Sequence, residues 1–291
     1  MFEGSMVAIV TPFKKGKIDE KAFTGLVNWQ IEQGTHAIIP CGTTGESATL
    51  DYDEHYRVIE LAVKAAKGRV PVIAGTGANS TDETIMMTKK AVQLKADGAL
   101  LVAPYYNKPT QKGIFLHYKA VSAAVKGFPL VLYNVPGRTA LNILPETVAR
   151  LSGIKNIVGV KEATGDMKQA SEIIRLCGSD FAVFSGDDFT TLPLYALGGR
   201  GAISVTANIA PAIEAGMWEA WKSGDREKAA RLHYELEPLN KAMFLETNPI
   251  PVKTALSMMG RIKEEFRLPL CEMSEENRKK LEKALSEKNL V

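Results

Sequence analysis

The run Ile157-Val158-Gly159-Val160-Lys161-Glu162 is apolar and β-branched until it ends on a lysine and a glutamate. It lacks strict polar alternation, which predicts a strand covered on both faces, as in parallel sheets. Other runs of the same character recur at intervals that fit one strand–helix unit each. They are Met6–Thr11, Ala37–Cys41, Val70–Gly75, Ala99–Pro104, Leu130–Asn134, Ala182–Gly186 and Gly201–Val205.

Helical patterns lie between these runs, and two of them begin with capping signals. Ser80 with Glu83 has the S-x-x-E spacing of a capping box, and Asp51 with Glu54 is an acidic version of it. The chain thus has eight apolar runs, each fitting one strand–helix unit. Eight such units in series predict the α/β class and a closed TIM (β/α)₈ barrel, in preference to an open doubly wound sheet. The first helices are expected at Asp19–Gln33, Asp51–Lys67 and Ser80–Ala96.

After about Asn208 the pattern becomes purely helical and exceeds what the last barrel helix needs. We therefore predict a barrel over residues 1–224 and a small C-terminal helical region over residues 225–291. The prolines in Asn248-Pro249-Ile250-Pro251 predict a rigid turn that enters a helix. The expected helices are Ile209–Lys222, one that starts at Asp225, Val252–Met259 and Glu275–Lys288.

Composition points to an ordinary globular protein. Of the 291 residues, 45% are apolar and 24% charged, which suits a large buried core without disulfides or metal. The formal charge of +3 is spread along the chain and predicts no nucleic-acid partner. The three cysteines form neither a disulfide framework nor a CxxC site. No signal peptide or membrane-spanning run is recognisable, so a cytoplasmic protein without a membrane partner is expected.

Lys161 stands where a TIM barrel keeps its chemistry, at the C-terminal end of a strand. Burial disfavours a charged lysine and favours a neutral, nucleophilic amine. Gly159, two residues earlier on the same face, is predicted to leave room for a small substrate. The alternative is a structural lysine that pairs with Glu162, and position alone does not decide between the two.

Other polar residues follow the remaining strands. Tyr133 offers a phenol that can relay protons, although a strand-end tyrosine is often only a packed aromatic. Thr43 and Thr44 lie in a glycine-flanked turn suited to binding a carboxylate. Arg138, expected in a loop, can hold a second carboxylate in a bidentate fork. Each of these signals is weak when taken alone.

Several other kinds of site are excluded by spacing. The run Gly75–Ser80 lacks the third glycine of a dinucleotide fingerprint, and no GxSxG nucleophile elbow occurs. The four histidines show no metal-ligand spacing. We therefore expect neither a metal nor another cofactor.

Taken together, these residues resemble the dihydrodipicolinate synthase / N-acetylneuraminate lyase family. The resemblance spans almost the whole chain, and although each motif is weak, their order along the barrel is specific. The matching motifs are Gly4-Ser-Met-Val-Ala-Ile-Val-Thr-Pro12, Gly42-Thr-Thr-Gly-Glu-Ser47, Pro104-Tyr-Tyr-Asn-Lys-Pro109, Tyr133-Asn-Val-Pro-Gly-Arg-Thr139, Gly159-Val-Lys-Glu-Ala163 and Asn248-Pro-Ile-Pro-Val-Lys253.

The resemblance implies a class I aldolase reaction. The amine of Lys161 forms an imine with pyruvate, and the derived enamine attacks L-aspartate 4-semialdehyde to give 4-hydroxy-tetrahydrodipicolinate, the first committed step of diaminopimelate and lysine biosynthesis. The residues implied are Lys161 as the nucleophile, Tyr133, Thr43 and Tyr106 as a proton relay, Thr44 at the pyruvate carboxylate, Arg138 at the semialdehyde carboxylate, and Gly186 and Ile203 as pocket lining.

Two other functions remain open at this stage. One is an aldolase for a sugar keto acid, such as N-acetylneuraminate lyase, against which Arg138 argues because a neutral polyhydroxy aldehyde offers no carboxylate. The other is a catalytically silent sensor that only binds a keto acid. The presence of the whole set of candidate residues argues against it, since a binding module needs only some of them.

The resemblance also implies assembly and feedback control. In the family Tyr106 enters the site of a neighbouring subunit, so a homodimer or homotetramer is expected. L-Lysine is implied as an inhibitor at a separate cleft. Its residues match Ala48, His55, Asn79, Glu83 and Tyr105, whereas Tyr52 stands where a lysine-sensitive form has histidine.

Overall fold

The computed structural model describes residues 2–291. Its main sheet has eight parallel strands in the order β4-β1-β10-β9-β8-β7-β6-β5, and β2 and β3 form a separate antiparallel hairpin. The strands are β1 (Gly4–Ala8), β2 (Phe13–Lys14), β3 (Lys17–Ile18), β4 (Ala37–Ile39), β5 (Ile73–Gly75), β6 (Gly98–Val102), β7 (Leu130–Asn134), β8 (Ile157–Glu162), β9 (Ala182–Ser185) and β10 (Gly201–Ser204).

The strand order confirms the predicted TIM barrel. The first strand, β1, lies beside the last, β10, and the N–H of Gly4 donates to the carbonyl of Arg200 at 2.9 Å. All other neighbours in the main sheet follow chain order. A doubly wound sheet has a switch point where the order reverses, and this order has none.

Helices follow the strands, and the last three make up most of the chain beyond residue 224. The longer helices are α1 (Glu20–Glu32), α2 (Tyr52–Ala66), α3 (Thr81–Gln93), α4 (Gln111–Ala124), α6 (Pro145–Ser152), α7 (Met167–Cys177), α9 (Pro211–Ser223), α10 (Arg226–Met243), α11 (Ile250–Met258) and α12 (Glu275–Ser286). The short ones are α5 (Pro136–Thr139), α8 (Thr191–Ala196), η1 (Ser47–Thr49), η2 (Asp188–Thr190) and η3 (Thr206–Asn208).

Strands β7 and β8 have the predicted bounds, whereas β5 begins three residues later than predicted, at Ile73. Pro71 has no N–H to give to the sheet, and the N–H of Val72 donates to the Asp97 carboxylate at 2.8 Å. Strand β1 ends early for a similar reason, because the N–H of Val10 donates to the Asn208 side chain. The hydrogen bonds between neighbouring strands therefore stop where side chains accept from the backbone N–H groups.

The hairpin of β2 and β3 was not predicted from the sequence. Each strand has only two residues, too few to show an alternating pattern. Lys15 and Gly16 turn the chain with φ of 56° and 75°. Their N–H groups donate to the carboxylate of Glu265, far along the chain, so a tertiary contact fixes this turn.

The structure falls into two compact units. The first contains Pro71–Ile203 together with the residues up to Gly4, and the second contains Ser5–Val70 and Ser204–Val291. The predicted division at residue 224 stays a prediction. None of the helices within residues 2–291 has both the length and the apolar character needed to cross a membrane.

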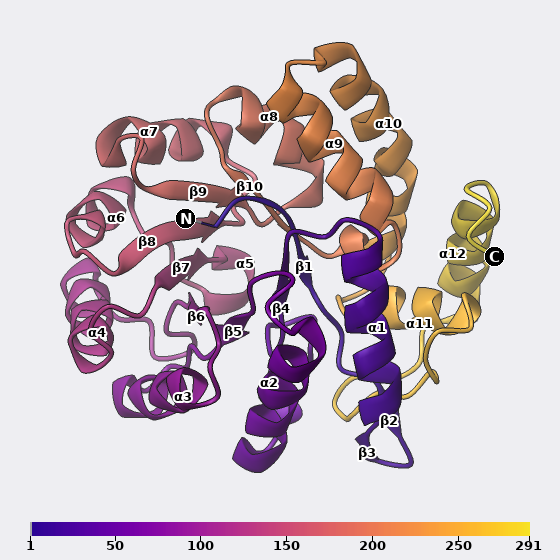
Figure 1. Ribbon diagram of the computed structural model, residues 1–291, viewed down its shortest axis with the longest axis horizontal. Coiled ribbons are helices and arrows are strands. Elements are labelled where there is room, and N and C mark those ends of the chain that lie inside the picture. The colour runs from indigo at the N-terminus through magenta and orange to yellow at the C-terminus, as the bar shows by residue number, and fades with distance from the viewer. Residues whose placement is uncertain (1) are drawn as a thin grey trace. The chain divides into compact units, whose positions relative to one another are not determined.

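In the first unit the core lies between the strands and the helices outside them. Helices α4, α6 and α7 lie on the outer side of β6 to β9 (Figure 1). Tyr118 of α4 is fully buried there, and its hydroxyl donates to the carbonyl of Leu101 at 3.2 Å. The face of the strands that the helices cover is therefore packed mainly with apolar side chains.

In the second unit both capping and the proline turn follow the sequence. Asp51 and Glu54 form a complete capping box at the start of α2. A proline turn enters α11 as predicted, with Pro249 as the N-cap, but the helix begins at Ile250, two residues before the predicted start, so Pro251 lies in its first turn. The corresponding cap of α3, in the first unit, has the Ser80 hydroxyl accepting from the Glu83 N–H at 3.4 Å.

Candidate active site

Lys161 and Tyr133 lie opposite each other on neighbouring parallel strands. In the register of β7 and β8 they are direct Cα partners. The Lys161 Nζ lies 4.5 Å from the centroid of the Tyr133 ring. Both residues are buried, with 5% and 8% of their surface exposed. The predicted nucleophile and the predicted proton relay are therefore neighbours at the C-terminal ends of their strands.

The carboxylate of Glu162 is engaged elsewhere, so the alternative reading of Lys161 is wrong. It accepts from the Asn134 amide at 3.0 Å, from the Gln169 amide at 3.1 Å and from the N–H of Thr164 at 2.8 Å. Strand alternation places it on the face opposite Lys161. Within residues 2–291 no salt bridge joins Lys161 to Glu162 or to any other carboxylate.

Gly186 and Gly159 lie near Lys161, and a side chain at either position would collide with a different neighbour. A Cβ on Gly186 would lie 2.8 Å from the Lys161 Cε, so the missing side chain leaves space for the lysine itself. A Cβ on Gly159 would lie 2.5 Å from the carbonyl oxygen of Ala182 on β9. Gly159 is thus required by the close approach of the next strand, and the prediction that it leaves room for a substrate is wrong.

Arg138 lies on the short helix α5, and the prediction of a loop is wrong at this point. Its exposed side chain follows directly after β7. The Asn134 side chain holds the far side of this helix, because its amide donates to Asn142 at 2.7 Å and its oxygen accepts from the N–H of Ile143 at 2.9 Å. The segment that carries Arg138 is thereby tied to the strand that carries Tyr133.

A buried polar network therefore supports the candidate site and was not predicted from the sequence. The Gln169 amide joins it by donating to the Glu162 carboxylate. Asn142 in turn donates to Gln169 at 2.7 Å. Asn134 and Glu162 stand beside the predicted site residues in their motifs, which is the only signal that the sequence offered for them.

The last strand of the first unit carries Ile203, the other residue that was predicted to line the pocket. Ile203 on β10 is 1% exposed, and its neighbour Ala202 pairs with Ser185, directly before Gly186. The structure thus brings Lys161, Tyr133, Gly186 and Ile203 to neighbouring strand ends, and Arg138 follows on the next helix.

The Tyr105-Tyr106 pair faces outward from the first unit. Tyr106 is 88% exposed and has a φ of 72°, unusual for a bulky residue. Burial raises the pKa of the Tyr105 hydroxyl, and the charge of Glu83 raises it further, whereas the backbone of Asn79 lowers it. The charge of Glu83 and the backbone of Asn79 thus both act on the Tyr105 hydroxyl.

The second unit carries the Thr43-Thr44 turn. The N–H of Glu46 donates to the Thr43 carbonyl at 3.1 Å, which closes the turn. Thr44 is 3% exposed, and its hydroxyl oxygen accepts from the Asn248 amide at 3.0 Å. In the sequence Asn248 was noted as part of a turn and of a matching motif, but it was not predicted to contact a site residue.

The other candidate residues of the lysine site also lie in the second unit. Ala48 is exposed on η1, and Tyr52 is the first residue of α2. Tyr52 is 49% exposed and stacks on Tyr56 with the ring centroids 6.4 Å apart. His55, one turn further, is 5% exposed. The predicted set is thus divided between two groups, each placed at the start of a helix or just before it.

The described residues also contain a cavity that lies away from this site. A cavity of about 590 Å³ lies where β7 and β8 begin, next to Pro129 and Val158, at the strand ends remote from Lys161. Those ends of a TIM barrel serve stability more than chemistry. Residues 2–291 contain no group of three or more histidine, cysteine, aspartate or glutamate side chains placed to hold a metal ion.

Comparison with known proteins agrees with this arrangement. The chain is 69% identical over the full length of both chains to a 4-hydroxy-tetrahydrodipicolinate synthase of Thermodesulfovibrio yellowstonii. It resembles the pyruvate complex of the dihydrodipicolinate synthase of Acinetobacter baumannii, with a TM-score of 0.98, 48% identity and full coverage of both chains. It also resembles the Cyanidioschyzon merolae enzyme with lysine bound, with a TM-score of 0.97 and 41% identity, covering 100% of this chain and 99% of the other.

The family model for the dihydrodipicolinate synthetase family matches residues 1–288. With a match of this extent, and with a lysine and a tyrosine side by side at the ends of β8 and β7, the chain belongs to the dihydrodipicolinate synthetase family.

Proposed function

We propose that this chain condenses pyruvate with L-aspartate 4-semialdehyde to give 4-hydroxy-tetrahydrodipicolinate, as a lyase of the pyruvate-dependent class I type. The observation that carries the proposal is the Lys161 amine, buried at a strand end against the Tyr133 ring and without a carboxylate partner among residues 2–291. Full-length relatives named for this reaction support it.

The chemistry assigns a step to each residue. The neutral amine of Lys161 attacks the keto carbon of pyruvate, and loss of water leaves an imine. The imine loses a methyl proton to become an enamine, whose carbon attacks the aldehyde. The amino group of the semialdehyde then attacks the imine carbon, closes the ring and releases Lys161. Tyr133 lies beside the amine and is placed to move the protons that these steps require.

Two carboxylates must be held in this reaction. We assign the pyruvate carboxylate to Thr44 and nearby backbone donors, and the semialdehyde carboxylate to the guanidinium of Arg138, whose planar fork suits a carboxylate. We assign Thr43, Tyr133 and Tyr106 to the proposed proton relay, and Gly186 and Ile203 to the lining of the pocket. A sugar-derived aldehyde has no carboxylate for Arg138, which disfavours the sugar-acid aldolase.

A substrate panel tests this function. With pyruvate fixed, L-aspartate 4-semialdehyde should be the preferred acceptor by at least about a hundredfold in kcat/KM over neutral sugar aldehydes, since a charged partner contributes a few kcal/mol. Consumption of a sugar aldehyde at a comparable rate would identify a sugar-acid aldolase. Binding of pyruvate without turnover of any aldehyde would identify a silent sensor.

We propose that the chain works as a homo-oligomer, a dimer or a tetramer, in which Tyr106 completes the site of a partner subunit. Tyr106 is a large aromatic residue that is 88% exposed, on backbone with positive φ. This exposure supports a contact with a partner subunit. In the oligomer this residue would supply the end of the proton relay.

Tyr106→Phe is therefore expected to lower kcat about 10- to 100-fold without dissociating the oligomer, because only the proton-bearing hydroxyl is lost. Tyr106→Trp should also weaken assembly by overfilling the contact. Steady-state kinetics and sedimentation velocity measure the two effects. Tyr234→Phe, at another exposed tyrosine on α10, is the matched control and should change neither. A fully active monomer at assay concentration contradicts the shared site.

We also propose that L-lysine inhibits the enzyme and that Asn79, Glu83 and Tyr105 in the first unit, and Ala48, Tyr52 and His55 in the second, respond to it. The structure supports one half of this set directly, because the charge of Glu83 acts on Tyr105. A carboxylate beside a phenol suits the ammonium group of an amino acid. The relative with lysine bound supports the same ligand for this chain.

Initial rates should fall as L-lysine rises and level off above zero, whereas D-lysine should have no effect. Glu83→Ala is expected to abolish inhibition by removing the carboxylate that faces the ammonium. Asp82→Ala, at the exposed neighbour in the same helical turn, is the control and should remain sensitive. If rates stay constant through millimolar L-lysine, these residues serve only the fold.

A further inference from the structure

Residues from the segment 248–267 form hydrogen bonds and an ion pair with the turn that carries Thr43 and Thr44. Asn248 contacts Thr44 across 204 positions of sequence, and Lys253 and the backbone of Arg267 contact Glu46 across 207 and 221 positions. All of these residues belong to the second unit. The C-terminal region is therefore in direct contact with a turn that the proposed function places at pyruvate.

The contact of Asn248 determines what the Thr44 hydroxyl can do. The Asn248 amide donates to the Thr44 oxygen at 3.0 Å, and both residues are buried, with 5% and 3% exposed. A threonine hydroxyl has one hydrogen to donate. With a donor facing its oxygen, the hydroxyl is oriented so that this hydrogen is available to another acceptor. An ionised carboxylate is such an acceptor and has no hydrogen of its own.

Glu46, at the end of the turn, is held by a buried ion pair. Its backbone has a φ of 54°, and its carboxylate binds the Lys253 ammonium and accepts from the N–H of Arg267 at 3.1 Å. Lys253 is 0% exposed and lies 4.4 Å from the centroid of the Phe13 ring. Burial lowers the pKa of the Lys253 ammonium, and the Glu46 carboxylate opposes that shift. Separation of the pair would leave a buried charge, so Glu46 is strongly fixed.

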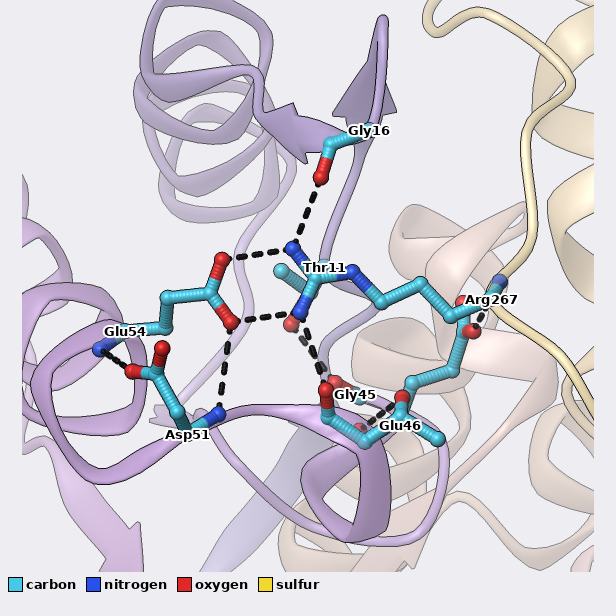
Figure 2. Close-up of polar contacts among 8 residues, drawn as sticks. Thr11, Gly16, Gly45, Glu46, Asp51, Glu54 and Arg267 are labelled. Carbon is cyan, nitrogen blue, oxygen red and sulfur yellow. Dashed lines mark hydrogen bonds and ion pairs between the residues drawn. The ribbon is translucent and has the colours of Figure 1, made fainter.

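The guanidinium of Arg267 forms hydrogen bonds with residues that follow the turn. It binds both oxygens of Glu54 and donates to the carbonyls of Thr49 and Gly16, each at 2.9 Å (Figure 2). Since Glu54 belongs to the capping box of α2, Arg267 joins the turn, this helix and the β2–β3 hairpin. Loss of the Arg267 side chain removes the support just after the turn, while Thr44 and the backbone contact to Glu46 stay chemically intact.

We propose that Asn248 and Arg267 are positioning residues for pyruvate: Asn248 orients the Thr44 hydroxyl to donate to the pyruvate carboxylate, and Arg267 holds the turn in place. The inference rests on the proposed function, because pyruvate is the ligand whose binding it explains. A purely structural role predicts equal damage to all kinetic constants, or damage to stability alone. Positioning predicts a selective loss of pyruvate affinity.

Asn248→Asp is the sharpest variant. Its carboxylate accepts the Thr44 hydrogen, so the hydroxyl can no longer donate to the substrate. The pyruvate concentration that gives half-maximal borohydride trapping should rise about 10- to 150-fold, the range expected for one hydrogen bond to a charged group. The KM for the semialdehyde should stay within about twofold. Asn248→Ala, which removes the donor without adding charge, should give a smaller rise of about threefold.

A double-mutant cycle shows whether Asn248 acts through Thr44. Thr44→Val has no hydroxyl to orient, so adding Asn248→Ala to it should not weaken pyruvate binding further. Additive losses in the cycle contradict this route. The cycle uses neutral replacements only, which separates the loss of orientation from charge repulsion by the aspartate.

Arg267→Ala tests the proposed role of Arg267 in holding the turn. Arg278→Ala is its matched control. Both arginines bind both carboxylate oxygens of a glutamate, but Arg278 binds Glu264 and, within residues 2–291, makes no hydrogen bond to the turn at residues 42–49. Arg267→Ala should raise the half-saturating pyruvate concentration on the order of tenfold, because small misplacements of a binding group are costly. Arg278→Ala should leave it unchanged, although both lower the melting temperature.

The outcomes separate this inference from the function on which it rests. If the unaltered chain traps no pyruvate, the proposed function fails and the inference fails with it. If it traps pyruvate on Lys161 while Asn248→Asp and Arg267→Ala both keep the normal half-saturating concentration, the positioning role alone is overturned.

Discussion

Lys161→Ala is expected to keep the fold and to lose kcat by about a thousandfold or more, because the amine that forms the imine is gone. The buried side chain makes no salt bridge within residues 2–291, so its removal leaves no unpaired carboxylate behind. Borohydride with pyruvate should add one pyruvyl mass to the peptide that contains Lys161. Circular dichroism and the melting temperature establish that the variant is folded.

A second buried lysine provides the internal control for this experiment. Lys253 is also buried, but its ammonium binds Glu46 and the carbonyl of Glu265, whereas the Lys161 amine faces an aromatic ring. An amine held by a carboxylate is a poor nucleophile, so burial alone should not lead to labelling. If the label appears on Lys253 or another lysine, or if Lys161→Ala still traps pyruvate, the Schiff-base assignment is wrong.

Arg138→Ala is expected to lower kcat/KM for the semialdehyde roughly 30- to 4000-fold, which corresponds to about 2–5 kcal/mol for one partner of a covered charge pair. In the chain without substrate Arg138 is exposed on α5. An ion pair that stays exposed contributes only about 0–1 kcal/mol. The size of the loss therefore reports whether the semialdehyde carboxylate is covered when it binds.

Imine formation with pyruvate should largely survive in this variant, because Arg138 is assigned to the other carboxylate. Arg138→Lys should recover only part of the loss, since a lysine keeps the charge but lacks the planar fork. Arg175→Ala, at an exposed arginine on α7, is the matched control and should be neutral. A variant that loses pyruvate trapping but keeps its semialdehyde KM reverses the assignment of the two carboxylate sites.

Much of the architecture follows from local patterns in the sequence. The apolar runs at β7 and β8 predicted both strands to the residue, because a strand covered on both faces must be apolar along its whole length. The same patterns placed Lys161 and Tyr133 at strand ends, where a TIM barrel builds its site. Capping residues predicted the start of α2 correctly, whereas the start of α11 was predicted at Val252, two residues later than its actual start at Ile250.

The same local reasoning misplaced features that depend on side-chain donors or on very short elements. The limits of β1 and β5 shifted because Asn208 and Asp97 accept backbone hydrogens that the ladder would have used. Helix α5 has only four residues and shows no helical period, so Arg138 was expected in a loop. The two strand limits were missed because hydrogen bonds between distant residues compete with local preference, and α5 was missed because it is too short to show a pattern.

By itself, the sequence determined the strand–helix order, the barrel and the identity of the candidate nucleophile, since these depend on hydrophobic periodicity and on residue type. Only the tertiary structure decided which partners those residues have. It placed Lys161 on the Tyr133 ring instead of on Glu162, and it assigned Gly159 to strand packing. It also brought Asn248 to Thr44 across 204 residues. The physical reason is that a side chain's partner is set by how distant segments pack together, and no periodic pattern along one chain records that packing.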